Sequence, residues 1–438
     1  MGILVVALHI QGVVILAVAV VLAVEVRVEA GDIIKNKNII LCVTGGIAVY
    51  KAVNLASFLK KRAANVYTVM TKNATHFVNP LTFKTITRNK VTIKMFDKSD
   101  FIPHISLSEL ADLVIVAPAT ANIIAKAANG IVDDMVSTLL LSVKCPKIVV
   151  PAMNTEMFLN PITQDNLQRL KKYGFIIVEP EKGILACGSE GIGRFPEIEK
   201  IYGYIIKTLA FKNSYFTNKN VLITLGGTIE DIDPVRCITN RSSGKMGFSF
   251  AFEFIKRGAN VTIIAANTKD SLIKEFEKTF PFVTIKRVRS AKEMYEEVLQ
   301  YKDNMDIYVM CAAVSDYYVE YSDSKIKKED NDELILKLKK NIDIIASLQK
   351  RRNAIYIGFA AESENLIENA KDKMAKKGMD FIIANKITGE KSAMGGDNAE
   401  VIVLDKNGNN IKIGFKDKNS IAYEVCNFLE ESIKKNIV

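Results

Sequence analysis

The chain has 438 residues, of which 49% are hydrophobic and 25% are charged. This length and composition predict roughly two or three folded domains and argue against a disordered protein. The net charge of +10 arises from 59 basic and 49 acidic residues scattered without a dense basic block, so small anionic ligands are favoured over a nucleic acid.

The six cysteines and three histidines argue against two common kinds of site. The cysteines form no C-x-x-C pair, so neither a zinc ribbon nor a redox dithiol is expected. The histidines are too few for a multi-histidine metal centre, and the sequence leaves any metal ligands unknown. Because nothing supports secretion with disulfides, a cytoplasmic location is expected.

Residues 1–24 carry no acidic or basic side chain when His9 is taken as neutral. About 20 apolar residues can span a bilayer, but this stretch lacks the basic flanks of a signal peptide or membrane anchor. We therefore interpret residues 1–36 as an apolar leader, either an extended start or an artefact. A membrane anchor is the second interpretation.

From residue 38, short β-branched runs alternate with helical stretches. The runs in the first half have the near-continuous apolar character of buried parallel strands; they are NIILCV (38–43), NVYTVM (65–70), LVIVAP (113–118) and KIVVPA (147–152). After about residue 174 this regularity gives way to a Gly-rich loop. The segment 212–220, rich in Lys, Asn and Ser, predicts a linker.

The alternation starts again at residue 220. We expect strands at 220–224, 259–266, 306–313, 354–361 and 379–385, then a hairpin of VIVLD and NIKIGF and a final helix over 418–435. The pattern in both halves therefore predicts the α/β class, with two Rossmann-like or flavodoxin-like domains. Each would be a mostly parallel sheet flanked by helices, with boundaries at 37–212 and 213–438.

Each half opens with a strand followed by two glycines, in VTGGIAVYK and ITLGGTIED. Glycines at this place let backbone amides approach an anion at the next helix N-terminus, so a phosphate-bearing ligand is expected. The sequence signatures of a P-loop and of a dinucleotide-binding loop are both incomplete. Thr239 and Met246 stand where a P-loop needs Gly and Ser or Thr, and Pro196 replaces the third glycine of a dinucleotide loop.

Polar side chains follow the ends of the first-half strands. They are Thr44, Thr71, Thr120, Asn122, Ser137 and Asn154. The carboxyl ends of parallel strands meet at one edge of a sheet, so this set suits a ligand with several hydroxyls and a phosphate. Taken singly, each residue is better explained as a helix or strand cap.

Two further residues of the first half could do chemistry. His104 precedes the helix-like stretch ISLSELAD, which leads into a strand that ends at the same edge. Cys187 lies on the Gly-rich loop ILACGSEGIGRF. Cysteines are usually small buried hydrophobes, but a thiol on such a loop can be carried into a site and serve as an acid.

In the second half, DPVRCITNRSSGKMG (233–247) gathers polar residues before a helix, which favours a bound anion there. The stretch CAAVSDY ends in Asp316 and is followed by KIKK (325–328). Lys373 and Lys377 share one helix face, an arrangement that hints at an anionic partner. For any single lysine, a solvated surface position remains the simpler interpretation.

The motifs occur in a specific order from about residue 37 to the C-terminus: GGIAVYK, HISLSELADLVIVAPATAN, PAMNTEMF, LACGSEGIGR, GGTIEDIDPVRCITNRSSGKMG, CAAVSDY, KIKK and GFAAES. In this order they resemble the family of bifunctional coenzyme A biosynthesis proteins, which join phosphopantothenoylcysteine decarboxylase to phosphopantothenate–cysteine ligase. The resemblance implies CTP-dependent ligation of cysteine to 4′-phosphopantothenate through an acyl-cytidylate. FMN-dependent oxidative decarboxylation and re-reduction to 4′-phosphopantetheine would follow.

For the first domain, the resemblance implies FMN as cofactor, an electron sink for a decarboxylation that would otherwise leave an unstabilised carbanion. His104 matches the active-site histidine, Asn154 the residue that holds the substrate carboxylate, and Cys187 the acid on a mobile flap whose glycines let it close. Met153 matches a substrate position. The implied FMN positions are Gly45, Gly46, Ile47, Thr71, Thr120, Asn122 and Ser137.

For the second domain, Asn240 matches the asparagine needed for the acyl-cytidylate, and Mg²⁺ is expected to screen the triphosphate. The implied CTP positions are Asp316, Lys325, Asn341, Asp343, Phe359, Lys373 and Lys377. The implied substrate positions are Gly226, Gly227, Arg236, Ser242, Ser243 and Lys245. Ile342 stands where the family usually has a proline, so we expect a changed loop with binding retained.

The resemblance also implies a homo-oligomer, with trimeric contacts in the first domain, FMN between subunits, and dimeric contacts in the second. The expected partners are small molecules; neither a nucleic acid nor a membrane is expected. Two alternatives stay open. Only one activity could be retained, or the chain could be a flavin-binding regulatory or partner-binding protein.

Overall fold

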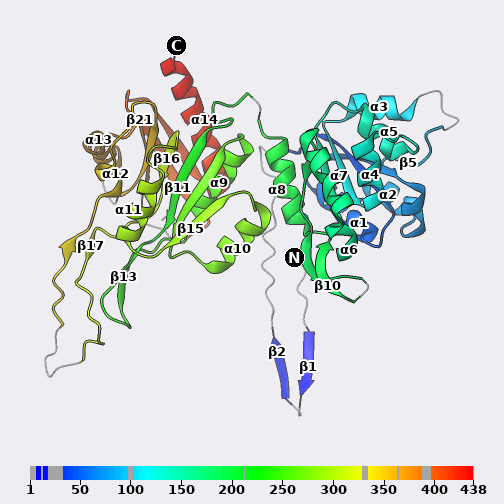
Figure 1. Cartoon of the computed structure of the whole chain (residues 1–438). Helices are drawn as coiled ribbons and strands as arrows, with labels where there is room; N and C mark the ends of the chain where they lie inside the picture. The colour runs from blue at the N-terminus through cyan, green and yellow to red at the C-terminus, as the bar shows by residue number, and fades with distance from the viewer. Residues whose placement is uncertain are drawn as a thin grey trace.

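The computed structural model describes residues 6–10, 13–17, 33–96, 102–186, 188–211, 213–327, 334–362, 365–386 and 396–437. Cys187 therefore lies outside the described residues. Within the described part, two α/β halves lie side by side, with helix α8 between them (Figure 1).

The first half contains a six-stranded, all-parallel sheet in the order β5-β4-β3-β6-β7-β8. Its strands are β3 (Asn38–Val43), β4 (Asn65–Met70), β5 (Val91–Thr92), β6 (Leu113–Ala119), β7 (Lys147–Pro151) and β8 (Ile176–Ile177). Four of these confirm the strands expected from the sequence. They could be recognised because both faces of a covered parallel sheet are apolar; every residue of β6, for example, is buried.

Helices cover both faces of this sheet. They are α1 (Val49–Lys61), α2 (Pro80–Thr87), α3 (Pro103–Leu110), α4 (Ala121–Asn129), α5 (Met135–Ser142), α6 (Thr155–Leu159), α7 (Pro161–Lys172) and the short 3-10 helix η1 (Lys72–His76). Alternate residues of β3 belong to two separate apolar clusters, with Leu41 on the α1 side and Ile40 on the α4 and α5 side. A hairpin of β9 (Glu181–Ile184) and β10 (Glu190–Arg194) then leads to α8 (Ile198–Thr208).

The second half contains an eight-stranded sheet in the order β15-β14-β11-β16-β19-β20-β21-β22. All neighbours are parallel except the pairs β20–β21 and β21–β22. The strands are β11 (Asn220–Gly226), β14 (Asn260–Ala266), β15 (Thr284–Val288), β16 (Ile307–Met310), β19 (Ile355–Glu362), β20 (Phe381–Lys386), β21 (Asn398–Asp405) and β22 (Asn410–Asp417). The predicted fold class and the late hairpin are confirmed.

The helices of this half are α9 (Lys245–Lys256), α10 (Asp270–Thr279), α11 (Ala291–Gln300), α12 (Ile344–Ser347), α13 (Leu366–Lys377) and α14 (Lys418–Ile437). Two small antiparallel pairs extend away from the large sheet (Figure 1). They are β12 (Ile229–Asp231) with β13 (Cys237–Thr239), and β17 (Tyr317–Tyr318) with β18 (Lys339–Lys340). We call residues 229–239 with the described residues of 317–340 the arm; the strand pattern did not predict it.

The described part of the expected linker, residues 213–220, packs against the second half. Phe216 is fully buried and its ring meets that of Phe254 on α9 edge-on, at 5.0 Å between centroids. The halves also touch through α8, where a Cβ at Gly203 would lie 1.7 Å from the carbonyl oxygen of Thr279. Aromatic side chains within a polar segment thus anchor it to the core of the second half.

Near the N-terminus, β1 (Val6–Ile10) and β2 (Val13–Ala17) pair as an antiparallel hairpin. Ile33 and Ile34, inside the range assigned to the leader, are buried in the core of the first half. Among the described residues, no helix combines the length and the apolar character needed to cross a membrane.

Candidate active sites

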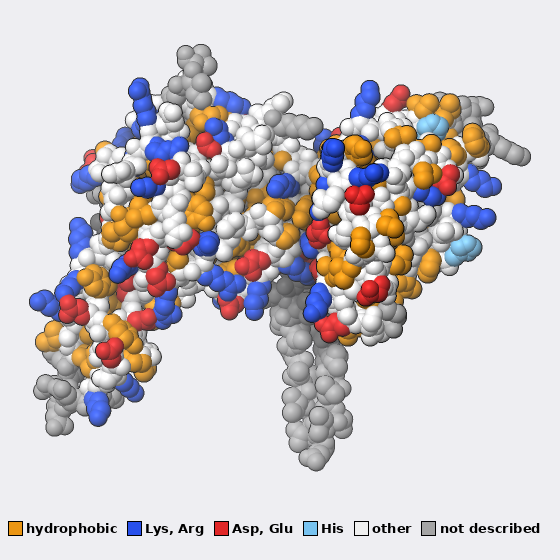
Figure 2. All heavy atoms as spheres, viewed as in Figure 1, with side chains coloured by type: hydrophobic (Ala, Val, Ile, Leu, Met, Phe, Trp, Pro, Cys, Tyr) orange, Lys and Arg blue, Asp and Glu red, His pale blue; other side chains and the backbone are white. Residues whose placement is uncertain are grey.

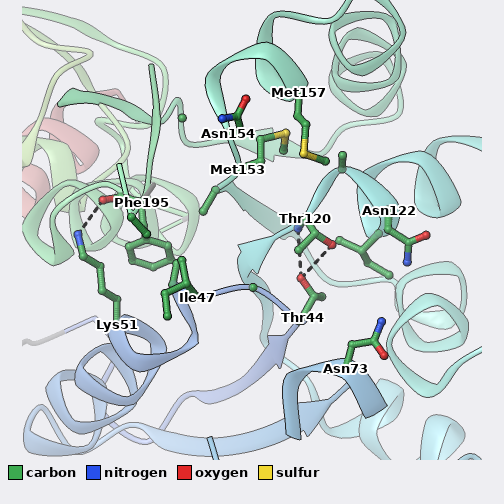
Figure 3. A pocket seen from close by; sticks show the side chains of 18 of the residues that line it. Thr44, Ile47, Lys51, Asn73, Thr120, Asn122, Met153, Asn154, Met157 and Phe195 are labelled. Atoms are coloured by element: carbon green, nitrogen blue, oxygen red, sulfur yellow. Dashed lines mark hydrogen bonds between the residues drawn. The ribbon is translucent and has the colours of Figure 1, made fainter. Parts of the chain in front are cut away.

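A cavity of about 920 Å³ lies at the carboxyl edge of the first sheet. Its wall is formed by the segments that follow β3, β4, β6 and β7, together with the β9–β10 hairpin (Figure 3). Eight of the predicted residues line it: Gly45, Gly46, Ile47, Thr71, Thr120, Asn122, Met153 and Asn154. The topology therefore brings most of the predicted first-domain set to one place.

Two helices begin at this cavity without a side-chain cap. Ala48 precedes α1 and Thr120 precedes α4, and neither side chain makes a cap hydrogen bond. Instead, Thr44 Oγ1 donates to the Pro118 carbonyl at 2.7 Å. It also accepts from the Thr120 amide at 3.1 Å (Figure 3). Helix N-termini left open in this way attract phosphate groups.

The first glycine of GGIAVYK is required by packing. A Cβ at Gly45 would lie 2.5 Å from Asn73 Cβ and 2.8 Å from the Asn73 carbonyl carbon, closer than carbon atoms can approach. Thr71 accepts a hydrogen bond from the Ala74 amide and so caps η1. These contacts shape the cavity wall between β3 and β4.

Asn154 and Met153 follow β7 and lie under the β9–β10 hairpin. Asn154 accepts from the Glu156 amide at 2.9 Å and caps α6. The Met153 amide donates to the Gly193 carbonyl at 3.0 Å. The hairpin that leads to and from position 187 is therefore held against the cavity by main-chain contact.

Two predicted residues, His104 and Ser137, do not line this cavity. Ser137 is buried and forms a reciprocal cap with Asp134, which itself lines the cavity. His104 lies in the first turn of α3, and its Nδ1 is buried without a hydrogen-bond partner in the described part of the chain. The fold of a single chain thus separates the histidine from the other predicted residues.

Sequence reasoning missed Lys51, which lines the same cavity. Its Nζ donates to the Phe195 carbonyl at 3.1 Å (Figure 3). Burial lowers the pKa of Lys51, and nearby Arg194 lowers it further. The position of Lys51 in the motif GGIAVYK, about one helical turn after the glycines, is the sequence feature that could have identified it.

A second cavity, of about 550 Å³, lies at the carboxyl edge of β11, β16, β19 and β20. Ten of the predicted residues line it: Asn240, Ser242, Ser243, Lys245, Asp316, Asn341, Asp343, Phe359, Lys373 and Lys377. Gly226, Gly227, Arg236 and Lys325 are not among its lining residues. Gly244 precedes α9 and makes no side-chain cap, so this helix also opens towards the cavity.

Gly226 and Gly227 do not line the cavity, but both lie in close contact with neighbouring backbone. Gly226 has φ +84°, and a Cβ there would lie 1.6 Å from the Ala266 carbonyl oxygen. A Cβ at Gly227 would lie 2.8 Å from the Asn240 carbonyl oxygen. Asn240 in turn donates from Nδ2 to the carbonyls of Ala313 and Val314, at 3.2 and 3.1 Å. Gly227 therefore allows the close approach of the Asn240 backbone, while Gly226 allows that of Ala266.

Arg236 holds the arm together. Its guanidinium donates to buried Asp233 Oδ2 at 2.6 Å and to the Ile326 carbonyl at 2.7 Å. Although burial raises the pKa of Asp233, Arg236 and the amides of Val235 and Ile326 more than offset this and hold the pKa well below its usual range. Lys325, next to Ile326, is exposed on the same arm.

The loop around Ile342 keeps its polar neighbours in place. The Ile342 amide donates to Asn341 Oδ1 at 2.9 Å, a bond that a proline could not make. Asn341 Nδ2 is buried with no partner among the described residues. Asp343 caps α12 and pairs with Lys377 Nζ at 2.7 Å. Both polar side chains thus reach the cavity in spite of the altered loop.

Within the described residues, no cluster of three or more His, Cys, Asp or Glu side chains is arranged to hold a metal ion. The second cavity is lined by the carboxylates of Asp316 and Asp343. One or two carboxylates are the usual protein share of a Mg²⁺ that arrives with phosphates.

A known protein family matches each half of the chain. The family "Flavoprotein" matches residues 28–210, and the family "DNA/pantothenate metabolism flavoprotein C-terminal domain" matches residues 216–433. The chain is similar to the coenzyme A biosynthesis bifunctional protein CoaBC of Bacillus subtilis, with 39% identity over 90% of this chain and 96% of that protein. CoaBC of Borreliella burgdorferi is 42% identical over 81% of this chain and 90% of that protein.

Solved structures also match each half separately. The C-terminal domain of a CoaBC protein covers 51% of this chain and 100% of its own, with 31% identity and a TM-score of 0.42. The FMN binding protein AtHal3 covers 39% of this chain and 95% of its own, with 30% identity and a TM-score of 0.35.

Proposed function

The chain belongs to the family of coenzyme A biosynthesis bifunctional proteins, and from that membership we propose which of its residues carry the two activities. It performs the phosphopantothenoylcysteine synthetase and decarboxylase steps of coenzyme A biosynthesis. The observation that supports our assignment is the presence of two separate cavities, each lined by most of one predicted residue set. We place the decarboxylase within 37–212 and the ligase within 213–438.

FMN is assigned to the first cavity. The open N-termini of α1 and α4 fit its phosphate, and Thr44, Thr71, Thr120 and Asn122 offer hydroxyl and amide groups for the ribityl chain. The cavity volume of about 920 Å³ is within the range of cofactor sites. When bound, FMN would supply the acceptor for the two electrons that leave the substrate thiol and the donor for the later re-reduction.

The decarboxylase residues are assigned as follows. Asn154 binds the substrate carboxylate and Met153 packs against the substrate beneath the β9–β10 hairpin. Cys187, which lies between β9 and β10 in the sequence, donates the proton that completes re-reduction; a thiol with an ordinary pKa near 8.5 is protonated at neutral pH. These roles follow the family pattern and the shared cavity wall of Met153 and Asn154.

His104 is assigned to the site of a neighbouring subunit, in a trimer with FMN between subunits. Its absence from the cavity lining and its buried Nδ1, which has no hydrogen-bond partner among the described residues, support this assignment. Helix α3 also presents Ile105 and Leu110 to solvent, and Ile102 just before it is exposed as well. Figure 2 shows apolar side chains gathered at the upper edge of this half, and an exposed apolar patch marks an interaction surface.

CTP and 4′-phosphopantothenate are assigned to the second cavity. The substrate carboxylate attacks the α-phosphate, pyrophosphate leaves, and an acyl-cytidylate forms; the amine of cysteine then displaces CMP and loses a proton. Lys373 and Lys377 on α13, with Asp316, Asn341, Asp343 and Phe359, bind the nucleotide together with its Mg²⁺. Asn240 stabilises the intermediate, and Ser242, Ser243 and Lys245 bind substrate at the start of α9.

The arm is assigned to a dimer contact of the ligase half, and Lys325 to nucleotide binding from that arm. The arm exposes six large apolar side chains: Val235, Tyr317, Tyr321, Leu334, Ile335 and Leu338. Ile335 is 87% exposed, and the apolar side chains of the arm stand out in Figure 2. Because its substrates are intracellular metabolites, we assign the enzyme to the cytoplasm.

The assignment is tested by assaying the two half-reactions separately with purified full-length protein. We expect an absorbance peak in the flavin region, CO₂ release from phosphopantothenoylcysteine, and CTP-dependent formation of that compound from cysteine and 4′-phosphopantothenate. A yellow protein without CO₂ release would instead support a flavin-binding regulatory protein. Loss of either activity alone would mean that one half is vestigial.

A further inference from the structure

Lys418 is a buried lysine in the wall of the ligase cavity that the sequence motifs did not single out. It is the first residue of α14, more than 170 residues after the SSGK motif, and only 7% of its surface is exposed. Its electrostatic neighbours are Lys245, Cys311 and Asp397. Lys373 and Lys377 instead interact electrostatically with the carboxylate of Asp343. The cavity therefore contains two distinct pairs of lysines.

Among the described residues, the positive charge of Lys418 has a neutral hydrogen-bond acceptor but no carboxylate partner. Its Nζ donates to the carbonyl of Gly396, which is a neutral acceptor. In the described part of the chain, no carboxylate is within ion-pair distance of this Nζ. The nearby Asp397 pairs with Lys245 instead and is itself 79% exposed. An ammonium has three donors, and a buried charge is costly unless it is paired.

Lys245 adds a second positive charge at the same place. It is the first residue of α9, whose N-terminus has no side-chain cap. Burial, and then the nearness of Lys245, lowers the pKa of Lys418. Two ammonium groups and an open helix N-terminus in one cavity all favour the same occupant, an oxyanion. Such an anion would relieve the repulsion between the two lysines.

We propose that Lys418 and Lys245 together bind an oxyanion of a ligase substrate, with Lys418 as its buried anchor from the C-terminal helix. This inference rests on the proposed ligase site. Two substrates carry phosphate groups: CTP with its triphosphate, and 4′-phosphopantothenate with its phosphate and a carboxylate. Cysteine has only a carboxylate beside its own ammonium group, so we assign this pair of lysines to one of the two phosphorylated substrates.

The test compares Lys418→Met, which keeps the apolar stem and removes the charge, with Lys412→Met as a control. Lys412 is an exposed lysine on β22 that pairs with Glu400. In full-length protein, Lys418→Met is expected to raise KM for CTP or for 4′-phosphopantothenate about tenfold or more, since a charge-assisted hydrogen bond is lost. The KM that changes identifies the source of the anion. KM for cysteine and the decarboxylase rate should stay unchanged, and Lys418→Arg should recover part of the loss.

Two outcomes would overturn the proposal. In one, folded Lys418→Met shows unchanged KM for both anionic substrates. In the other, KM for all three substrates and the thermal midpoint change together, as expected if Lys418 only anchors Gly396 and Asp397.

A second measurement uses the unaltered protein and does not need ligase turnover. Acetylation of Lys418 and Lys412 by an amine reagent is followed by peptide mass spectrometry, with inorganic pyrophosphate, CTP, 4′-phosphopantothenate or no ligand present. At least one anion should slow the labelling of Lys418 relative to Lys412; if none does, the proposal is wrong. Protection without any ligase activity would contradict the proposed function but leave the anion site standing.

Discussion

The amide of Met153 donates a hydrogen bond to the carbonyl of Gly193 at 3.0 Å, and a Cβ at Gly193 would lie only 2.3 Å from the Met153 carbonyl oxygen. A Cβ at Gly191 would likewise meet Thr155 Oγ1 at 2.1 Å. These glycines were expected to let a flap move. In the structure they permit close packing of the β9–β10 hairpin over the cavity, and Gly188, with φ +86° and open space around it, is the turn glycine.

Replacing Gly193 by Ala should therefore damage the decarboxylase. The added methyl clashes with backbone and the φ of +131° disfavours any side chain, so we expect destabilisation of about 1–3 kcal/mol and a decarboxylase kcat/KM at least about tenfold lower. Ligase activity should persist. The control is Gly414→Ala on β22, where a Cβ meets nothing within 4 Å. Unchanged decarboxylation by the Gly193 variant would refute the packing role.

Cys187→Ser should separate oxidation from reduction. The variant is expected to bind FMN and release CO₂ from phosphopantothenoylcysteine, because neither step uses the thiol proton. It should then accumulate the unsaturated thiol product, since a serine hydroxyl is a far weaker acid than a thiol. Mass spectrometry of the products is the readout. Normal yields of 4′-phosphopantetheine would rule out the acid role of Cys187.

Asn240→Asp should impair the ligase alone. Asn240 Nδ2 donates to the carbonyls of Ala313 and Val314, and a carboxylate in its place would face two acceptors without a proton to give. We expect ligase kcat about 100-fold or more lower, with decarboxylase unchanged. Asn267→Asp, in an exposed turn, is the matched control. Equal damage to both activities would contradict the assignment of one site to each half.

Asp233→Asn should weaken the arm in a pH-dependent way. The pKa of Asp233 is lowered in the folded chain, so its carboxylate stabilises the fold above the ordinary aspartate pKa of about 3.9. This stabilisation is lost as pH falls through the lower folded pKa. Urea unfolding should show the variant clearly less stable at pH 7, with the difference shrinking below about pH 4. Asp303→Asn, at an exposed position, should show no such trend.

The strands and most of the cavity residues could be predicted because they depend on local pattern and on one rule of topology. Buried parallel strands such as LVIVAP are apolar on both faces, and their carboxyl ends meet at one edge. Thr120 and Asn122 were therefore placed beside Thr44 correctly. The arm was missed because β12, β13, β17 and β18 are two or three residues long, too short for a periodic pattern to be visible.

The sequence by itself determined the fold class, the family and the residues at each strand end, since these are encoded in short-range periodicity and in ordered motifs. Only the tertiary structure decided which of those residues meet. It leaves His104 out of the lining of the cavity that contains Asn154, makes Gly193 a packing residue against Met153, and brings Lys418 of the last helix to Lys245 of α9. Such contacts join residues that are far apart in the chain, and they form only when the sheet sets the order of its strands.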